Sequence, residues 1–503
     1  MVTSGQFFRN VVVNWLAMLM NMLVPFFLSP FTVHHLGLAL YGVWVLVISS
    51  VVYFNLLDLG LRNAVVRFVA KAHASGDHDE AVRVASTAVW MRVAIGLLIF
   101  LLAALLAFVF PHIFSILPSL YLQVRLTVLL TALGIAMTLI FGITGAILSA
   151  IHRFDLISSV TTVRALVRAG GFVWLLSHGH GIVWLAGWEL TVAVLVGVAQ
   201  SCLCLREYPE LRRGFGILHM ETARKIWLYG SYASLITLAG AVLYYSDNVV
   251  VGAMLGVTTV TYYAIAGNLS ASAREVVSAL SSTFTPMASS LEAVGKNEQL
   301  RRLLVQGTRA SLLVYLPIAC VLAIRGQSFV NLWMGREYGQ TAGVILKILI
   351  LNHVLTTANV TSCGIAYGMG KHRPLVIWAI IEAVLNLALS VVLARQIGIY
   401  GVAWGTAIAG GICNLMFWPR YISRLVPIDP WEYIWSAWLP AFAAVIPFLL
   451  GCYWEEKHLA ASSMVAFFMQ VAAALPLMAV SAAVLFRNEL GRYLRLRLRP
   501  ADV

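Results

Sequence analysis

Long apolar segments recur along almost the whole of this 503-residue chain, and they restrict its fold more than any other feature. Each segment has about the 20 residues that a helix needs to cross a bilayer. A segment in lipid must satisfy its own backbone hydrogen bonds, so each is predicted to be a helix. We predict fourteen spans, at roughly 8–30, 40–61, 86–110, 125–150, 158–178, 182–204, 226–250, 258–284, 307–326, 342–367, 374–395, 401–419, 434–453 and 463–486.

Composition agrees with lipid as the solvent of these segments. Hydrophobic residues make up 61% of the chain and charged residues only 11%, whereas soluble domains carry about 25% charged residues. The first segment is long for a signal sequence, and Pro25 and Pro30 stand at its end in place of a cleavage site, so we interpret it as a retained helix. The fifth and sixth segments are separated only by His178-Gly179-His180-Gly181, which leaves a single re-entrant hairpin as the alternative there.

Lysine and arginine residues are unevenly divided between the alternating loops. One set of loops, together with both chain ends, holds 27 of the 34 basic residues; the other set holds six, and Arg274 lies within a span. Because cytoplasmic loops are enriched in Lys and Arg, we place both termini in the cytoplasm and expect an even number of spans. Topology also accounts for most of the net charge of +13, so no nucleic-acid partner is expected.

The two parts of the chain correspond at an offset of 219 residues. We therefore predict two pseudo-symmetric six-helix lobes, residues 1–206 and 207–424, followed by two extra helices and a basic cytoplasmic tail in 425–503. Halves with the same orientation are related by an axis along the membrane normal, with the substrate path between them. The pairs at this offset are Gly37 and Gly256, Gly76 and Gly295, Arg83 and Arg302, Gly145 and Gly364, and Gly179 and Gly398.

Sequence signatures of catalysis are not found in the chain. It has no phosphate-binding G-x-x-x-x-G-K-[ST] loop, no H-E-x-x-H and no G-x-S-x-G. His178-x-His180 has no nearby acidic or Cys partner, and Cys202-x-Cys204 has neither zinc nor redox spacing. We therefore predict a carrier driven by a gradient, and neither an enzyme nor a protein with a cofactor or metal.

Arg274 and Glu275 lie mid-way along the eighth predicted span, where charge is costly unless it faces a partner or a cavity. Consecutive residues point about 100° apart on a helix, so the two face each other poorly. Two interpretations stay open for Arg274: an ion pair with Asp247 of the seventh span, or contact with an anionic substrate in a central cavity.

Arg164 and Arg168 are four residues apart in the fifth predicted span and therefore share one helix face. They either line the cytoplasmic half of a cavity or extend to the lipid headgroups. Glu189, in the sixth span, is a buried acid to which the sequence assigns no role.

Other acidic residues within spans are candidates for ion pairing or for proton coupling. For Asp58, the alternative is an ion pair with Arg62 one turn later. Pro25 and Pro30 in the first span indicate either a flexible gate or a static kink, because proline removes a helical hydrogen bond. The candidate buried acids are Asp58, Asp247, Glu275 and Glu382.

Several short motifs resemble the Wzx-type flippases of bacterial polysaccharide biosynthesis, in the multidrug/oligosaccharidyl-lipid/polysaccharide exporter superfamily. The resemblance implies two six-helix lobes around a cationic central cavity. It also implies an undecaprenyl-pyrophosphate-linked oligosaccharide as substrate, moved from the cytoplasmic to the periplasmic leaflet of the inner membrane. Polysaccharide polymerase and chain-length proteins would be its partners. The motifs are Tyr41-Gly42, Leu57-Asp-Leu-Gly-Leu61, Gly76-Asp77, Tyr245-Ser-Asp247-Asn-Val-Val-Val-Gly252 and Arg274 with Pro286.

Such a substrate matches the candidate residues in chemical type. A pyrophosphate needs basic groups in a low-dielectric cavity, where charge attraction is strong. The sugars would bind amides and aromatic rings. For the pyrophosphate the candidates are Arg274, Arg164, Arg168 and Arg309, and for the sugars Asn14, Asn21, Tyr244 and Tyr245.

Three rival functions fit less well. A cation-coupled multidrug exporter of the same superfamily is the first alternative, but the first span has no acid to bind the coupling ion. A lipid II flippase would have several arginines within the first two spans, where only Arg9 and Arg62 occur, at the ends. A membrane-embedded glycosyltransferase would need large outer loops, and those predicted here are short.

Overall fold

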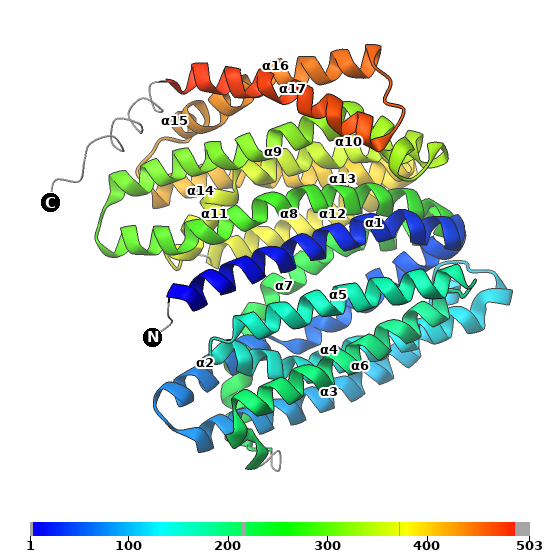
Figure 1. The fold of residues 1–503 in the computed structure, drawn as a ribbon, viewed down its shortest axis with the longest axis vertical. Coiled ribbons are helices and arrows are strands. Elements are labelled where there is room, and N and C mark those ends of the chain that lie inside the picture. Colours follow the sequence, from blue (N-terminus) through cyan, green and yellow to red (C-terminus); the bar gives the residue numbers. More distant parts are fainter. Residues whose placement is uncertain (1–3, 214–217, 372, 488–503) are drawn as a thin grey trace. The chain divides into compact units, whose positions relative to one another are not determined.

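The computed structural model describes residues 4–213, 218–371 and 373–487, with side chains for all of these except 4–19, 21, 213, 231–239 and 278–282. Over these residues the fold is wholly helical, without a strand (Figure 1). Among the described helices, eleven segments are long and apolar enough to cross a membrane. The prediction of an all-helical, polytopic membrane protein is therefore confirmed.

The chain divides into two units, residues 1–261 and 262–503. Seven α-helices and three short 3-10 turns make up the described part of the first unit, up to the start of α8. They are α1 (Ser4–Val51), η1 (Val52–Asp58), α2 (Leu61–Ala74), α3 (His78–Ile113), η2 (Pro118–Leu120), α4 (Tyr121–Ala150), α5 (Phe154–Ser177), α6 (Ile182–Glu207), η3 (Pro209–Arg213) and α7 (Met220–Leu255).

The second unit contains most of α8 and all later described helices. Two of its elements, η4 and η5, are single π-helical turns within longer helical stretches. Its elements are α8 (Val257–Ala293), α9 (Asn297–Trp333), α10 (Arg336–Ala358), α11 (Val360–Gly368), α12 (Arg373–Ile397), α13 (Ile399–Ile412), η4 (Cys413–Phe417), α14 (Trp418–Leu425), α15 (Pro430–Tyr433), η5 (Ile434–Trp438), α16 (Leu439–His458) and α17 (Met464–Leu485).

The first predicted span and the start of the second lie in one helix, α1. α1 continues through Pro25 and Pro30, and its backbone leaves the helical conformation at Gly37, where φ is 72° and ψ is 172°. The spans predicted at 8–30 and 40–61 therefore lie on either side of this kink, and the second ends in η1. By contrast, α5 and α6 are separate helices, and each is long and apolar enough to cross a membrane on its own.

The turn between α2 and α3 follows directly from local sequence. α2 ends at Ala74, Gly76 takes a φ of 71°, and α3 begins at His78. The Asp77 carboxylate accepts a hydrogen bond of 2.9 Å from the backbone N–H of Glu80, which caps the first turn of α3. The conformation of Gly76 and the cap from Asp77 therefore make this turn a local feature of the sequence.

The 219-residue offset reappears in helix starts and in backbone geometry. α3 begins at His78 and α9 at Asn297, and α5 begins at Phe154 and α12 at Arg373, both at this offset. A positive φ suits glycine because glycine has no Cβ to clash. Three of the predicted glycine pairs have positive φ at both members: Gly37 and Gly256, Gly76 and Gly295, and Gly179 and Gly398.

In the second unit, a buried polar network joins α16 and α17 to α9. The Arg325 side chain is fully buried and donates hydrogen bonds to Glu455 (2.9 Å), Glu456 (3.2 Å) and Gln470 (2.6 Å). A charge within a membrane helix is tolerated when it is paired in this way. The network therefore gives the last two described helices a specific attachment to their unit.

In the first unit, α4 packs against α3 and α6, while α5 packs against α1 and α6 (Figure 1). Small residues allow some of these close approaches. At Gly171 of α5, a Cβ would overlap the indole ring of Trp188 of α6. This arrangement leaves a partly open cavity between α1, α4, α5 and α6.

Candidate functional site

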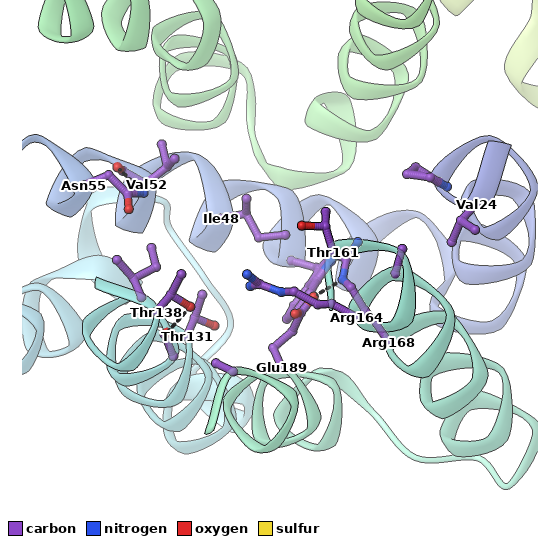
Figure 2. A pocket seen from close by; sticks show the side chains of 16 residues that line it. Val24, Ile48, Val52, Asn55, Thr131, Thr138, Thr161, Arg164, Arg168 and Glu189 are labelled. Atoms are coloured by element: carbon purple, nitrogen blue, oxygen red, sulfur yellow. Dashed lines mark hydrogen bonds and ion pairs between the residues drawn. The ribbon is translucent and has the colours of Figure 1, made fainter. Parts of the chain in front are cut away.

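A cavity of about 450 Å³ lies within the first unit, a volume typical of small-molecule sites. α1 and η1 form one wall, and α4, α5 and α6 form the others (Figure 2). Its polar and charged lining residues are Asn55, Thr131, Thr138, Thr161, Arg164, Arg168 and Glu189.

α5 supplies the cations of the cavity. Arg164 and Arg168 stand one turn apart on this helix, and both side chains line the cavity (Figure 2). Arg164 makes neither a hydrogen bond nor an ion pair with any residue that the structure describes. Both arginines therefore line a cavity of the first unit, and their contact with a substrate stays a prediction.

Arg168 has two partners. Its Nε atom donates to a carboxylate oxygen of Glu189 of α6, and its guanidinium lies 5.0 Å from the ring centroid of Phe172. The Arg168 side chain is 31% exposed and that of Glu189 19%, so the pair stands at the cavity wall. Trp188 beside it donates to the backbone oxygen of Val167 at 3.2 Å, which fixes α6 against α5.

Four neutral polar side chains complete the polar lining. Three already hydrogen-bond to backbone oxygens of their own segments: Thr138 to Gly134, Thr161 to Ile157 and Asn55 to Val52. The buried hydroxyl of Thr131 has no hydrogen-bond partner among the described residues. Because this oxygen has almost no accessible surface, Thr131 adds an unsatisfied polar group to the wall and no direct contact point for a ligand.

The other lining residues are largely apolar and give the cavity a low dielectric constant. Trp44, Ile48 and Val52 project from the second part of α1 and from η1, and Pro25 stands on the first part. Two arginines and one glutamate leave a net charge of +1. In such surroundings a fixed cation attracts an anion far more strongly than in water.

The sequence did not indicate several of these residues. Trp44, Asn55 and Thr131 are ordinary residues of a membrane helix, and only the packing of four helices brings them to one cavity. The sequence indicated Glu189 as a buried acid but gave it no role, because its partner Arg168 lies 21 residues away on another helix. No spacing rule within one helix connects them.

Arg274, of α8, lies in the second unit. Its side chain is 18% exposed, and its Nη2 atom is 4.0 Å from a carboxylate oxygen of Glu275, itself 59% exposed. Tyr315 of α9 and His353 of α10 are its electrostatic neighbours. Asp247 belongs to the other unit, is buried, and has Tyr53 as an electrostatic neighbour.

Arg309 is held by its own unit. Its Nε atom donates to the backbone oxygen of Ser436 at 2.7 Å, and its guanidinium lies 5.3 Å from the ring centroid of Phe486. Ser436 lies in the π-helical turn η5.

Glu382 lies mid-way along α12 and is half-buried. It has no ion pair among the described residues.

Of the four sugar-binding candidates, the two with described side chains, Tyr244 and Tyr245, do not line the cavity. Tyr244 and Tyr245 lie on α7, and Tyr244 is 51% exposed. Asn14 and Asn21 fall on α1, but their side chains lie outside the described residues. Next to Asp247, the amide of Asn248 donates to Ser49 at 3.0 Å and ties α7 to α1.

Asp58 pairs with Arg92 and not with Arg62, so that expectation is corrected. Asp58 ends η1, and its carboxylate lies 2.5 Å from a guanidinium nitrogen of Arg92 in α3. The Arg92 side chain is 2% exposed, and it also donates to the backbone oxygen of Leu139. Arg92 therefore acts as an internal tie between α3, α4 and η1, and it does not serve as a loop charge.

Solved transporters share this fold. The chain superposes on a structure of the lipid II flippase MurJ with a TM-score of 0.73, 13% identity, and coverage of 96% of this chain and 99% of MurJ. An inward-facing multidrug resistance MATE family transporter gives a TM-score of 0.67 at 14% identity, covering 83% and 98%. The fold is therefore that of the helical membrane transporters.

Sequence comparison identifies the family. A model described as polysaccharide biosynthesis protein matches residues 7–292, and a second, MatE, matches residues 233–392. The chain belongs to the polysaccharide biosynthesis protein family. It is 24% identical over 428 residues to the uncharacterized membrane protein EpsK of Bacillus subtilis, covering 84% of each chain. It is 22% identical over 286 residues to the probable low-salt glycan biosynthesis flippase Agl15 of Haloferax volcanii, covering 56% of this chain and 57% of Agl15.

Proposed function

We propose that the protein is a lipid-linked oligosaccharide flippase. It moves undecaprenyl-pyrophosphate-linked sugar units from the cytoplasmic to the periplasmic leaflet of the bacterial inner membrane, for O-antigen or exopolysaccharide synthesis. Alternating access exposes the site first to one side and then to the other. The family membership, the similarity to a protein named as a glycan biosynthesis flippase, and a flippase-like fold support this function.

The observation that carries the proposal is the cavity of the first unit. Arg164 is a cation on a helix long enough to span a membrane, it lines a cavity, and no described residue forms an ion pair with it. Such an unpaired charge is costly unless it serves a ligand or a water-filled path. A phosphate group of the substrate would be the anion that pairs with Arg164.

The proposal includes the complete topology. Eleven candidate spans are counted among the described residues. One of them, Met22–Ala74, contains the kink at Gly37, with one helix before it and one after it. α7 and α8 have 36 and 37 residues and are not among the eleven. With these three helices included, we propose fourteen spans, cytoplasmic termini, and lobes 1–206 and 207–424 followed by 425–503.

The remaining predicted residues keep the roles proposed from the sequence. In the second unit Arg274 would contact the pyrophosphate as the substrate changes sides, with Arg309 as a further candidate. Pro25, at the cavity, and Pro30 would bend α1 as a gate. Asp58, Asp247, Glu275 and Glu382 are the acids proposed for ion pairing or proton coupling; Asp58 already has its partner. Polysaccharide polymerase and chain-length proteins would receive the product.

A cation-coupled multidrug exporter is the second candidate, because MATE transporters share the fold. The cavity argues against it, since its net charge of +1 repels cationic drugs. Deleting the gene separates the two functions. A flippase mutant accumulates lipid-linked oligosaccharide on the cytoplasmic side and loses surface polymer. Unchanged polymer together with drug sensitivity would contradict the proposal.

A further inference from the structure

The Arg168–Glu189 pair at the cavity wall differs from the structural ion pairs of this unit. Both its members line a cavity, and the second cation of that cavity, Arg164, lies one turn away without a partner among the described residues (Figure 2). Glu189 bonds only the Nε atom of Arg168. The two terminal nitrogens of this guanidinium make no hydrogen bond with any described side chain or backbone group.

We propose that Glu189 is an internal counter-anion. It pairs with Arg168 while no substrate is bound, and the diphosphate of the substrate replaces it as the partner of Arg168. This inference rests on the proposed function and assigns a specificity role to Glu189. The empty cavity then presents one free cation, and the occupied cavity presents two, one turn apart on α5. A diphosphate carries two anionic groups, so it is favoured over ligands with a single charge.

The surroundings allow this exchange. Two unpaired arginines in one apolar cavity would repel each other, so a resting counter-ion lowers the cost of an empty site. The Glu189 side chain is 19% exposed, which leaves its carboxylate in reach of water once Arg168 has turned to the ligand. The Phe172 ring stays beside the guanidinium during this turn and stabilises its charge.

A matched control pair joins the same two helices outside the cavity. Arg153, at the N-terminus of α5, binds Asp155 at 3.1 Å and also Glu207, the last residue of α6. The hydrogen bond from Arg153 to Asp155 raises the pKa of the guanidinium, which stays charged. None of these three residues lines the cavity. Glu207→Gln therefore removes an α5–α6 ion pair without touching the candidate site.

The experiment measures the affinity of inorganic pyrophosphate for the purified full-length protein by equilibrium binding. Glu189→Gln is expected to bind pyrophosphate about tenfold more tightly than the wild type, because the competing carboxylate is gone. Glu207→Gln is expected to bind as the wild type does. In an Arg168→Gln background, the Glu189→Gln change should have no further effect, since Glu189 then has nothing to release.

Two results would overturn the inference. One is unchanged or weaker binding in Glu189→Gln. The other is a tightening that persists in the Arg168→Gln background, which would mean a general charge effect. If Glu189→Gln does not fold, Glu189→Asp serves instead, because its shorter carboxylate weakens the pair and should tighten binding by a smaller factor.

The proposed function fails in a different way. Loss of binding in Arg164→Gln, with no change in Glu189→Gln, would remove the counter-anion role and keep the anion site. Wild-type affinity in both Arg164→Gln and Arg168→Gln would show that the cavity is not an anion site, and both proposals would fall. Absence of pyrophosphate binding in the wild type and in Glu189→Gln would have the same meaning.

Discussion

Arg164 is the residue on which the proposed transport depends most directly. Replacing it with Gln keeps a polar side chain and removes the only cavity cation without a partner among the described residues. We expect surface polymer to fall at least tenfold at normal protein levels, because a charge-assisted contact in a low-dielectric cavity is lost. Arg164→Lys should retain partial export. Full export in Arg164→Gln, assayed by complementing a deletion strain, would exclude it as a substrate contact.

Arg92 and Asp58 have a different role from Arg164, since they stabilise the fold. Removing one partner leaves the other charge buried, so Arg92→Met or Asp58→Asn should each destabilise the protein by about 3–5 kcal/mol. The double variant should be less damaged than the sum of the two. Thermal unfolding of the purified variants measures this. Additive losses would show that the 2.5 Å contact does not couple the two side chains.

Two glycines next to α2, Gly60 and Gly76, have similar backbone conformations but different space around them. Gly60 has a φ of 70°, and a Cβ there would overlap the backbone of Gly230 of α7. Gly76 has nearly the same φ, of 71°, but open space around its missing Cβ. Gly76→Ala should therefore cost only the conformational strain, about 1 kcal/mol. Gly60→Ala should cost clearly more, because α2 and α7 must also separate.

The two glycine variants control for each other in one measurement. Their melting temperatures and yields, compared with the wild type, separate conformational strain from loss of the helix contact. Equal destabilisation of the two would show that the approach of Gly60 to Gly230 contributes little. Packing explains the Leu57-Asp-Leu-Gly-Leu61 motif. Asp58 forms an ion pair with Arg92 of α3, and Gly60 allows the close approach of α7.

For the whole molecule, the proposed topology can be tested with single cysteines. Ser75 lies in the exposed turn between α2 and α3, and Ser177 at the exposed end of α5. In a Cys202→Ser background, Ser177→Cys should react with an impermeant maleimide applied to intact cells, whereas Ser75→Cys should react only after permeabilisation. The reverse labelling pattern would show that the orientation inferred from the basic loops is wrong.

Much of this molecule could be predicted from the order of its residues. Apolar segments of spanning length specify helices, because lipid cannot satisfy an open backbone. Positive-φ glycines at one offset specify equivalent turns in both parts of the chain. The Ser75-Gly76-Asp77 turn and the cap of α3 are likewise local, so sequence and structure agree there.

Only the tertiary structure decided which charges meet. Asp58 pairs with Arg92, 34 residues away, and not with Arg62 one turn away. Arg168 pairs with Glu189 of another helix. Both choices depend on helix rotation and packing, which small residues such as Gly171 allow and which no local periodicity encodes. The sequence by itself therefore determined a helical, membrane-embedded protein. Three-dimensional packing decided that Arg164 lines a cavity, because a side chain's partners depend on neighbours from distant parts of the chain.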